Sequence, residues 1–187
     1  MACDIATGRL VPCKDKAAGI KALYFVNYGD LQGNITFDVS NDQLVTELFE
    51  AASTVDVYRY DVKKATSLEQ TMASSDETGT TAVDQVLTAK LIVTNAATNK
   101  QISLIAYGRP HVIVEYNNGD AAVMGIYNGV TTTTAVSTLG PNMVDDNSYT
   151  LTINGEEEQY ANFIDGAVKG DPFAGLANQP SSVVAGT

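Results

Sequence analysis

Alternation of hydrophobic and polar residues marks several stretches of the chain as strands with one polar face. The clearest is 55–63, where valines and tyrosines are interleaved with charged residues. Residues 21–28 and 82–94 are rich in branched and aromatic side chains, 35–39 alternates, and 67–72 continues the ladder. The first half of the chain is therefore predicted to be mostly β-structure.

The period changes once, between residues 96 and 107. Here Ile102 and its apolar neighbours recur at helical spacing. Asn95 or Thr98 is suited to begin a helix, and Gly108 is suited to end it. We expect a single amphipathic helix over this range.

Two Asn-Gly pairs predict hairpins in the second half. Asn-Gly suits the positive φ angles of a type I′ turn. The first pair lies in 117–120, between the predicted strands 111–116 and 121–126. The second is Asn154-Gly155, expected to turn the strand 149–153 back into residues 156–163.

The remaining segments are low in charge and lack a clear period. Residues 128–139 form a threonine-rich, low-complexity stretch that we interpret as a loop. We divide the chain into an extended N-terminal arm (1–20), a β-core domain (21–164) and a flexible C-terminal segment (165–187) without regular structure. The predicted fold is mainly β, a β-sandwich or barrel with one flanking α-helix (about residues 96–107) and extended termini.

Composition narrows the possible partners. Hydrophobic residues make up 44% of the chain, enough for a sizeable core, whereas charged residues make up only 18%. The formal net charge is −11, which disfavours adhesion to nucleic acid, so DNA is expected only as a non-adhering cargo. No apolar run is long enough to span a membrane, and the first residues do not resemble a signal peptide, so we expect a chain made in a cytoplasm.

Few residues could carry chemistry. Cys3 and Cys13 could form a disulfide or half a metal site, but two reduced thiols are the favoured interpretation, since no histidine or third cysteine lies nearby. His111 is the single histidine, and its place at a strand start favours a structural role. No cofactor is expected, and we predict that the protein is not an enzyme.

Clustered carboxylates suggest two kinds of site as alternatives, a metal site or the active site of a hydrolase. Residues 145–147 and 156–158 could bind a hard cation, or a carboxylate such as Asp145 or Glu157 could serve a small hydrolase. Adjacent strand residues point to opposite faces, so the glutamate run cannot converge on one ion. We favour a solvated hairpin edge whose charges discourage stray strand pairing.

Three phrases of the sequence resemble a known group of proteins. They are the N-terminal phrase 3–25 with Cys3-Asp4-Ile5 and Cys13-Lys14-Asp15, the phrase Gly125-Ile126-Tyr127-Asn128-Gly129, and the phrase 148–156. Together they look like virion structural proteins of tailed phages, most like tail-tube (major tail) proteins. The resemblance spans most of residues 1–163 and does not cover the segment after Asp165.

This resemblance implies a function. Tail-tube proteins are β-barrels or sandwiches with one flanking helix, and they stack as hexameric rings around a channel for DNA. The chain would then be a self-assembling virion subunit, assembled in the host cytoplasm and located in the virion tail, with itself and other virion proteins as partners. An acidic lumen would let DNA pass without adsorbing.

The same resemblance suggests assembly contacts. The basic arm, with Arg9, Lys14 and Lys16, could dock on an acidic neighbour, because residues 145–187 hold seven acids and one lysine, among them Asp145 and Asp146. The threonine-rich stretch, with Thr132 and Thr133, could extend across a ring-to-ring contact. Deletion of residues 1–20 is then expected to abolish polymerisation.

Other functions remain open at this point. The chain could be another virion part, such as a head–tail connector, a capsid decoration or a fibre-base protein. It could also be a carbohydrate-binding β-sandwich module, although such modules often present tryptophan for sugar stacking and this chain has none.

Overall fold

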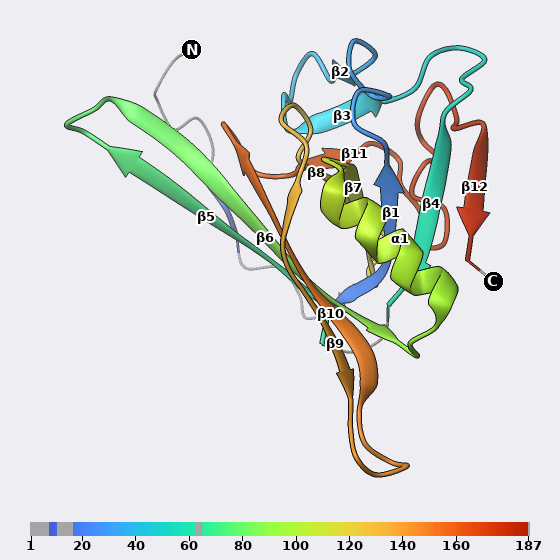
Figure 1. The fold of residues 1–187 in the computed structure, drawn as a ribbon. Coiled ribbons are helices and arrows are strands. Elements are labelled where there is room, and N and C mark those ends of the chain that lie inside the picture. Colours follow the sequence, from blue (N-terminus) through green and yellow to red (C-terminus); the bar gives the residue numbers. More distant parts are fainter. Residues whose placement is uncertain (1–7, 11–16, 63–64, 187) are drawn as a thin grey trace.

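Two β-sheets and one helix make up the fold in a computed structural model that describes residues 8–10, 17–62 and 65–186 (Figure 1). This confirms the predicted mainly β sandwich with a single helix. The larger sheet has eight strands in the spatial order β12 (Ser182–Ala185), β4 (Asp56–Asp61), β1 (Ile20–Val26), β7 (His111–Tyr116), β8 (Ala121–Met124), β11 (Asn162–Ile164), β3 (Leu44–Glu47) and β2 (Thr36–Phe37). The smaller sheet has four, in the order β5 (Ser67–Ser75), β6 (Thr80–Ile92), β10 (Asn147–Glu157) and β9 (Thr131–Leu139).

The larger sheet is buried on both faces near its centre, which explains why β1 and β7 are almost continuously apolar. Along β1, Leu23 and Phe25 belong to one hydrophobic core while Tyr24 and Val26 belong to another. The first core joins the larger sheet to the smaller one. It includes Leu87, Ala89 and Leu91 of β6 and Tyr149, Leu151 and Ile153 of β10.

The second core lies on the opposite face of the larger sheet, where the C-terminal segment helps to cover it. Phe173 and Leu176 are buried there. The Phe173 ring meets the rings of Tyr24 and Phe49 edge-on, at centroid distances of 5.5 and 5.7 Å. Edge-to-face contacts of this kind add to the stabilisation from burial.

The expectation that residues after Asp165 have no regular structure was therefore wrong. Beyond the buried Phe173 and Leu176, β12 pairs in parallel with β4, and Ser182 Oγ donates to Asp56 Oδ1 at 2.7 Å. The Gly, Ala, Pro and Ser content gives the segment little intrinsic propensity for regular structure. Two large apolar side chains and an open sheet edge supply tertiary contacts that composition does not reveal.

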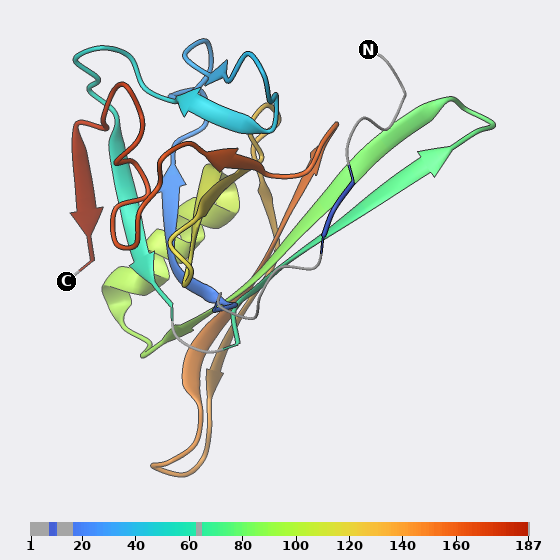
Figure 2. The same ribbon diagram turned by 180° about the vertical axis from the view of Figure 1, so that it is seen from behind.

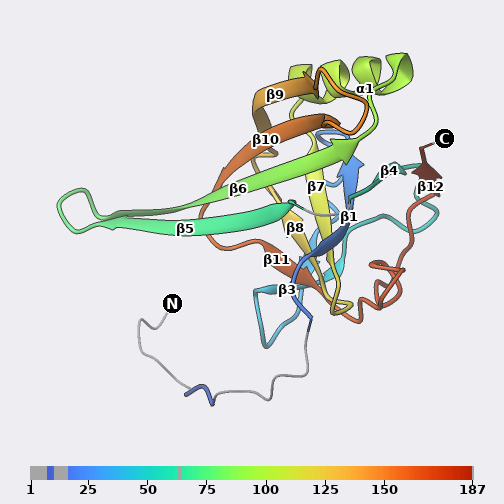
Figure 3. The same cartoon turned by 90° about the horizontal axis from the view of Figure 1, so that it is seen from below.

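Helix α1 (Ala96–Tyr107) has the predicted bounds. The Asn95 side chain accepts a hydrogen bond from the Thr98 backbone N–H at 2.7 Å, and Gly108 follows the last turn. Ile102 is buried in the first core, and the helix lies beside β9 (Figure 3). No helix in the described residues is long and apolar enough to cross a membrane.

One predicted hairpin is confirmed and the other is wrong. Gly119 has φ +101° in the turn between β7 and β8, where Tyr116 N–H donates to Asp120 O at 2.9 Å. By contrast, β10 runs straight through Asn154 and Gly155, which pair with Val86 and Gln85 of β6. Gly155 is useful here for its size, because a Cβ atom would lie 3.2 Å from Val130 Cγ1.

The threonine-rich stretch is likewise a strand and not a loop. Most of it forms β9, which pairs along its length with β10. Threonine is β-branched and favours extended backbone, so a run of threonines can form a strand even without apolar alternation.

Candidate functional site

One face of the smaller sheet is turned away from the larger sheet, and we call it the outer face. Alternation along β10 defines it: Tyr149, Leu151 and Ile153 are buried, so Thr150 and Thr152 point the other way. The strand registers extend this face to the neighbouring strands. It comprises Ser67, Glu69, Thr71, Asp84, Val86, Thr88, Lys90, Thr134, Val136, Thr150, Thr152, Asn154 and Glu156.

The outer face is mostly neutral and polar, and its charge is predominantly negative. Glu69, Asp84 and Glu156 are exposed on it. Lys90 is its one cation among those residues, and Lys90 Nζ lies 2.6 Å from Asp146 Oδ2. The hydrogen bond from Lys90 lowers the pKa of Asp146 below its ordinary value. The face therefore presents little positive charge to a polyanion.

Two long edges flank this face, and neither pairs with another strand among the described residues. The strands β5 and β9 are the ends of the four-stranded order, and each is nine residues long. Six residues of β5 and eight of β9 are exposed, and α1 lies beside β9 without burying it. Neither strand contains proline or lysine, and Glu69 is the single charged residue in the pair. Such edges invite pairing with another strand.

The hairpins formed by these strands project from the body at opposite ends of the smaller sheet (Figures 1 and 2). The β5–β6 hairpin carries Asp76 and Glu77 in its turn. The turn of the β9–β10 hairpin carries Asp145 and Asp146, and its tip is formed by Met143 and Val144. Both hairpins extend well beyond the region in which the two sheets cover each other, so they form two long projecting arms.

Four of the contact residues suggested by the sequence lie on the β9–β10 hairpin, two near the end away from its turn and two in the turn. Thr133 Oγ1 donates to Thr152 O at 3.1 Å, and Thr132 lies partly buried beside it. Asp145 and Asp146 lie in the turn of the same hairpin. Arg9 is exposed, whereas Lys14, Lys16 and both cysteines lie outside the described residues. Sequence reasoning missed the β5 edge, because its mixed small and polar residues give no sign of which edge stays unpaired.

Two carboxyl groups and one imidazole are buried among the described residues, and the first of these three groups, Glu115, joins distant segments. Glu115 Oε1 accepts from Lys21 Nζ at 2.6 Å and from the Gly170 N–H at 2.8 Å, while Oε2 accepts from Tyr24 Oη at 2.9 Å. Burial alone would raise the pKa of Glu115, but these hydrogen bonds hold it below the ordinary value. The Glu115 carboxylate, on β7, therefore links the C-terminal segment to β1 and β7 by hydrogen bonds.

Glu157 corrects another expectation, since this residue was placed on a solvated hairpin edge. It is buried at the end of β10, and Oε1 accepts the backbone N–H groups of Tyr127 and Asn128 at 3.0 and 2.8 Å. Burial raises the pKa of Glu157, and the two hydrogen bonds oppose that shift. The side chain holds the loop 125–129, while Glu156 points outward as strand geometry requires.

His111 is the third buried group and lies at the start of β7. Its Nδ1 is 2.6 Å from Gly125 O, so Nδ1 carries the proton and donates. The His111 ring stacks on the ring of Tyr28. The Arg109 guanidinium lies over the same Tyr28 ring, 5.1 Å from its centroid. Burial lowers the pKa of His111. These contacts give the imidazole a packing role at the base of the loop.

Within the described ranges, no three His, Cys, Asp or Glu side chains are grouped so that they could hold a metal ion. The geometry that stands out is therefore a surface: a neutral to acidic outer face bounded by two strands whose outer edges have no partner in the described ranges. Comparison with protein-family models, curated proteins and solved structures finds no match to this chain.

Proposed function

We propose that this protein is a virion structural subunit that self-assembles into stacked hexameric rings, forming a phage tail tube through which DNA passes. The observation that carries the proposal is the smaller sheet, which has two long edges unpaired within the part of the chain that the structure describes and an outer face poor in positive charge. The resemblance of the sequence to tail-tube proteins supports it independently.

The strand directions favour head-to-tail pairing between copies. Each neighbouring pair in the smaller sheet is antiparallel, so β5 and β9 run in opposite directions. When copies are arranged about a rotation axis, β9 of one copy meets β5 of the next in an antiparallel sense. The contact uses two different surfaces, so it is heterologous and can close into a ring.

Pairing of this kind closes the smaller sheets into one barrel. Six copies would contribute about 24 strands, spaced about 4.8 Å apart and tilted by about 40°, which gives a barrel about 50 Å across at the backbone. Barrels of about 16–18 strands already enclose an aqueous channel. A ring of six therefore leaves room for a nucleic-acid duplex.

The outer face is the one that would line this channel, because the larger sheet covers the opposite face. Its threonines, serines and acids offer no cluster of cations to phosphate groups. DNA affinity comes largely from cationic contacts, so a duplex would pass along such a surface without adhering.

Matched lysine substitutions test the edge pairing. Thr134 of β9 and Thr152 of β10 are direct cross-strand partners on the outer face. Thr134→Lys places a charge on the unpaired edge and should block ring formation, whereas Thr152→Lys adds the same charge on an inner strand and should leave rings intact. Negative-stain images and sedimentation velocity report the outcome. Rings from the Thr134→Lys variant as abundant as those of the wild type would refute edge pairing.

A further inference from the structure

The turn of the β9–β10 hairpin exposes an apolar pair at its tip. Met143 and Val144 are 106% and 94% exposed. Both lie in the turn of the β9–β10 hairpin, which projects from the body (Figures 1 and 2). Apolar side chains gathered at a projecting tip are a feature of surfaces that are covered by a partner.

The turn that carries this pair is held by several hydrogen bonds. Asp145 Oδ2 accepts from Asn142 N–H and from Asn142 Nδ2, at 2.8 and 2.9 Å. Gly140 N–H donates to Asp146 O at 2.9 Å, and Asp146 is in turn bound by Lys90. The tip therefore has a defined shape, with Met143 and Val144 directed outward and two carboxylates behind them.

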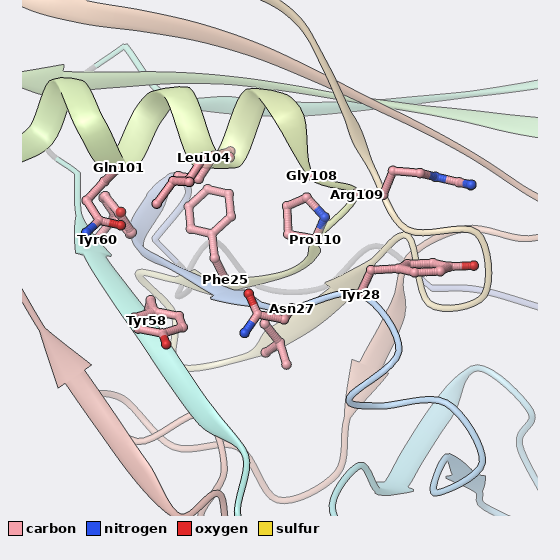
Figure 4. A pocket seen from close by; sticks show the side chains of 12 residues that line it. Phe25, Asn27, Tyr28, Tyr58, Tyr60, Gln101, Leu104, Gly108, Arg109 and Pro110 are labelled. Carbon is pink, nitrogen blue, oxygen red and sulfur yellow. The ribbon is translucent and has the colours of Figure 1, made fainter.

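An apolar groove of about 380 Å³ lies between α1 and the strands β1 and β4 (Figure 4). Its walls are formed by Phe25, Tyr58, Tyr60, Leu104, Ile105 and Pro110. Leu104 is 54% exposed although it lies on the wall of this groove. The groove thus offers apolar surface to a side chain that enters from outside.

The groove and the tip are complementary in charge as well as in polarity. Arg109 is the one charged residue among those that line the groove. It is fixed at the rim by its hydrogen bond to Asn128 O at 2.5 Å and by its position over Tyr28. The tip carries Asp145 and Asp146 directly after its apolar pair.

The tip cannot fill the groove of its own chain, because the hairpin points away from the body. Moreover, α1 runs away from the β9–β10 turn, so that its C-terminal end at Gly108 lies farther from this turn than its N-terminal end (Figures 1 and 2). We propose that Met143 and Val144 of one copy insert into the groove of a second copy, with Asp145 facing Arg109. This contact rests on the proposed function and deepens it: it joins the projecting tip of one copy to the groove beside α1 of the next, so it stacks rings whereas edge pairing closes them.

Disulfide trapping tests the contact directly. We would combine Met143→Cys with Leu104→Cys in a chain that also carries Cys3→Ser and Cys13→Ser. Mild oxidation of the assembled protein should give a ladder of covalent oligomers on a non-reducing denaturing gel. The matched control joins Leu104→Cys to Val39→Cys, which is equally exposed but lies away from the tip, and it should give no ladder. Met143→Cys alone should also give none.

Assembly of the uncrosslinked protein separates the two proposals. Met143→Ser with Val144→Ser should leave single rings and reduce the length of stacks several-fold, since both residues are exposed and the fold does not depend on them. Normal stacks from this variant, no ladder from the paired cysteines, or dimers from Met143→Cys alone would overturn the tip contact while leaving ring formation in place. Absence of rings from the wild-type chain would instead overturn the proposed function, and the tip contact with it.

Discussion

Asp84 of β6 and Glu156 of β10 are direct cross-strand partners, so two exposed carboxylates lie opposite each other on the outer face. Like charges in this arrangement destabilise a sheet. The pair therefore adds negative charge to the outer face at a cost in folding stability. In the proposed tail tube, where the channel surface must not bind phosphate, such a pair has a use.

Removing one charge of this pair should stabilise the protein. Asp84→Asn keeps the side-chain size and removes the repulsion, so we expect the free energy of unfolding to rise by about 0.5 kcal/mol. Urea denaturation followed by circular dichroism measures the change. Asp42→Asn, at an exposed site in the loop before β3, is the control and should have little effect. Equal effects at the two sites would count against repulsion between Asp84 and Glu156.

Reversing the charge of the outer face should make it adhere to DNA. The triple variant Glu69→Lys, Asp84→Lys and Glu156→Lys places three cations on one face, so affinity for a short duplex should appear at low salt and fall steeply as salt rises. Fluorescence anisotropy reports this binding.

The control for that variant changes net charge equally at exposed residues away from the outer face, by Asp42→Lys, Glu50→Lys and Glu77→Lys. It should bind the duplex more weakly. If both variants bind alike, net charge and not the outer face governs adhesion.

Breaking the Glu115 cluster should be costly. Glu115→Ala leaves Lys21, Tyr24 Oη and the Gly170 N–H without their acceptor, and we expect a loss of about 3 kcal/mol in the free energy of unfolding. Glu115→Gln keeps an acceptor oxygen and should cost less. Because the pKa of Glu115 is lowered in the fold, its contribution is present above the ordinary carboxyl range and is lost as the pH falls through the folded value. Denaturation curves at neutral and acidic pH test both statements.

Glu157 should have the opposite pH dependence. Its folded pKa is raised above 4.5, so its contribution to stability is full below that value and is lost as the pH rises through the folded pKa. Glu157→Gln removes this titration while its side-chain oxygen still accepts from Tyr127 and Asn128. The variant should therefore be at least as stable as the wild type at neutral pH. A large loss of stability at neutral pH would show that the carboxylate charge is needed.

The N-terminal arm has its own test. Ile20 begins β1, and Gly19 O accepts from Asn117 N–H at 2.9 Å, so a deletion that reaches residue 20 would disturb the core as well. Deletion of residues 1–16 avoids this and should abolish polymerisation with an unchanged melting temperature. Normal tubes from the shortened chain would refute a role for the arm in assembly.

Local signals in the sequence predicted the local parts of the fold. Asn95 and Gly108 define the helix because capping depends on residues within one turn, and Gly119 defines its hairpin for the same reason. The hairpin predicted at Asn154-Gly155 does not form, because a long cross-strand ladder with β6 overrides the turn preference of this pair. The position of Phe173 depends on a contact with Tyr24 that is far away in sequence, and no local pattern reports it.

The sequence predicted the charge of the candidate surface but not the strands that bound it. Negative charge and the absence of a cationic stripe predicted a surface to which DNA does not adhere. Which strands end the smaller sheet depends on the long-range pairing of β6 with β10, which joins residues 56 to 74 positions apart. The edges β5 and β9 become evident once that pairing is known.

The most direct test of the proposed assembly is the native mass and shape of the purified protein. Sedimentation velocity across a range of concentrations, with negative-stain images of the same samples, should give six-fold rings and stacked tubes with a central channel. A single sharp monomer boundary that persists as the concentration rises, with no rings or tubes in the images, would contradict the account.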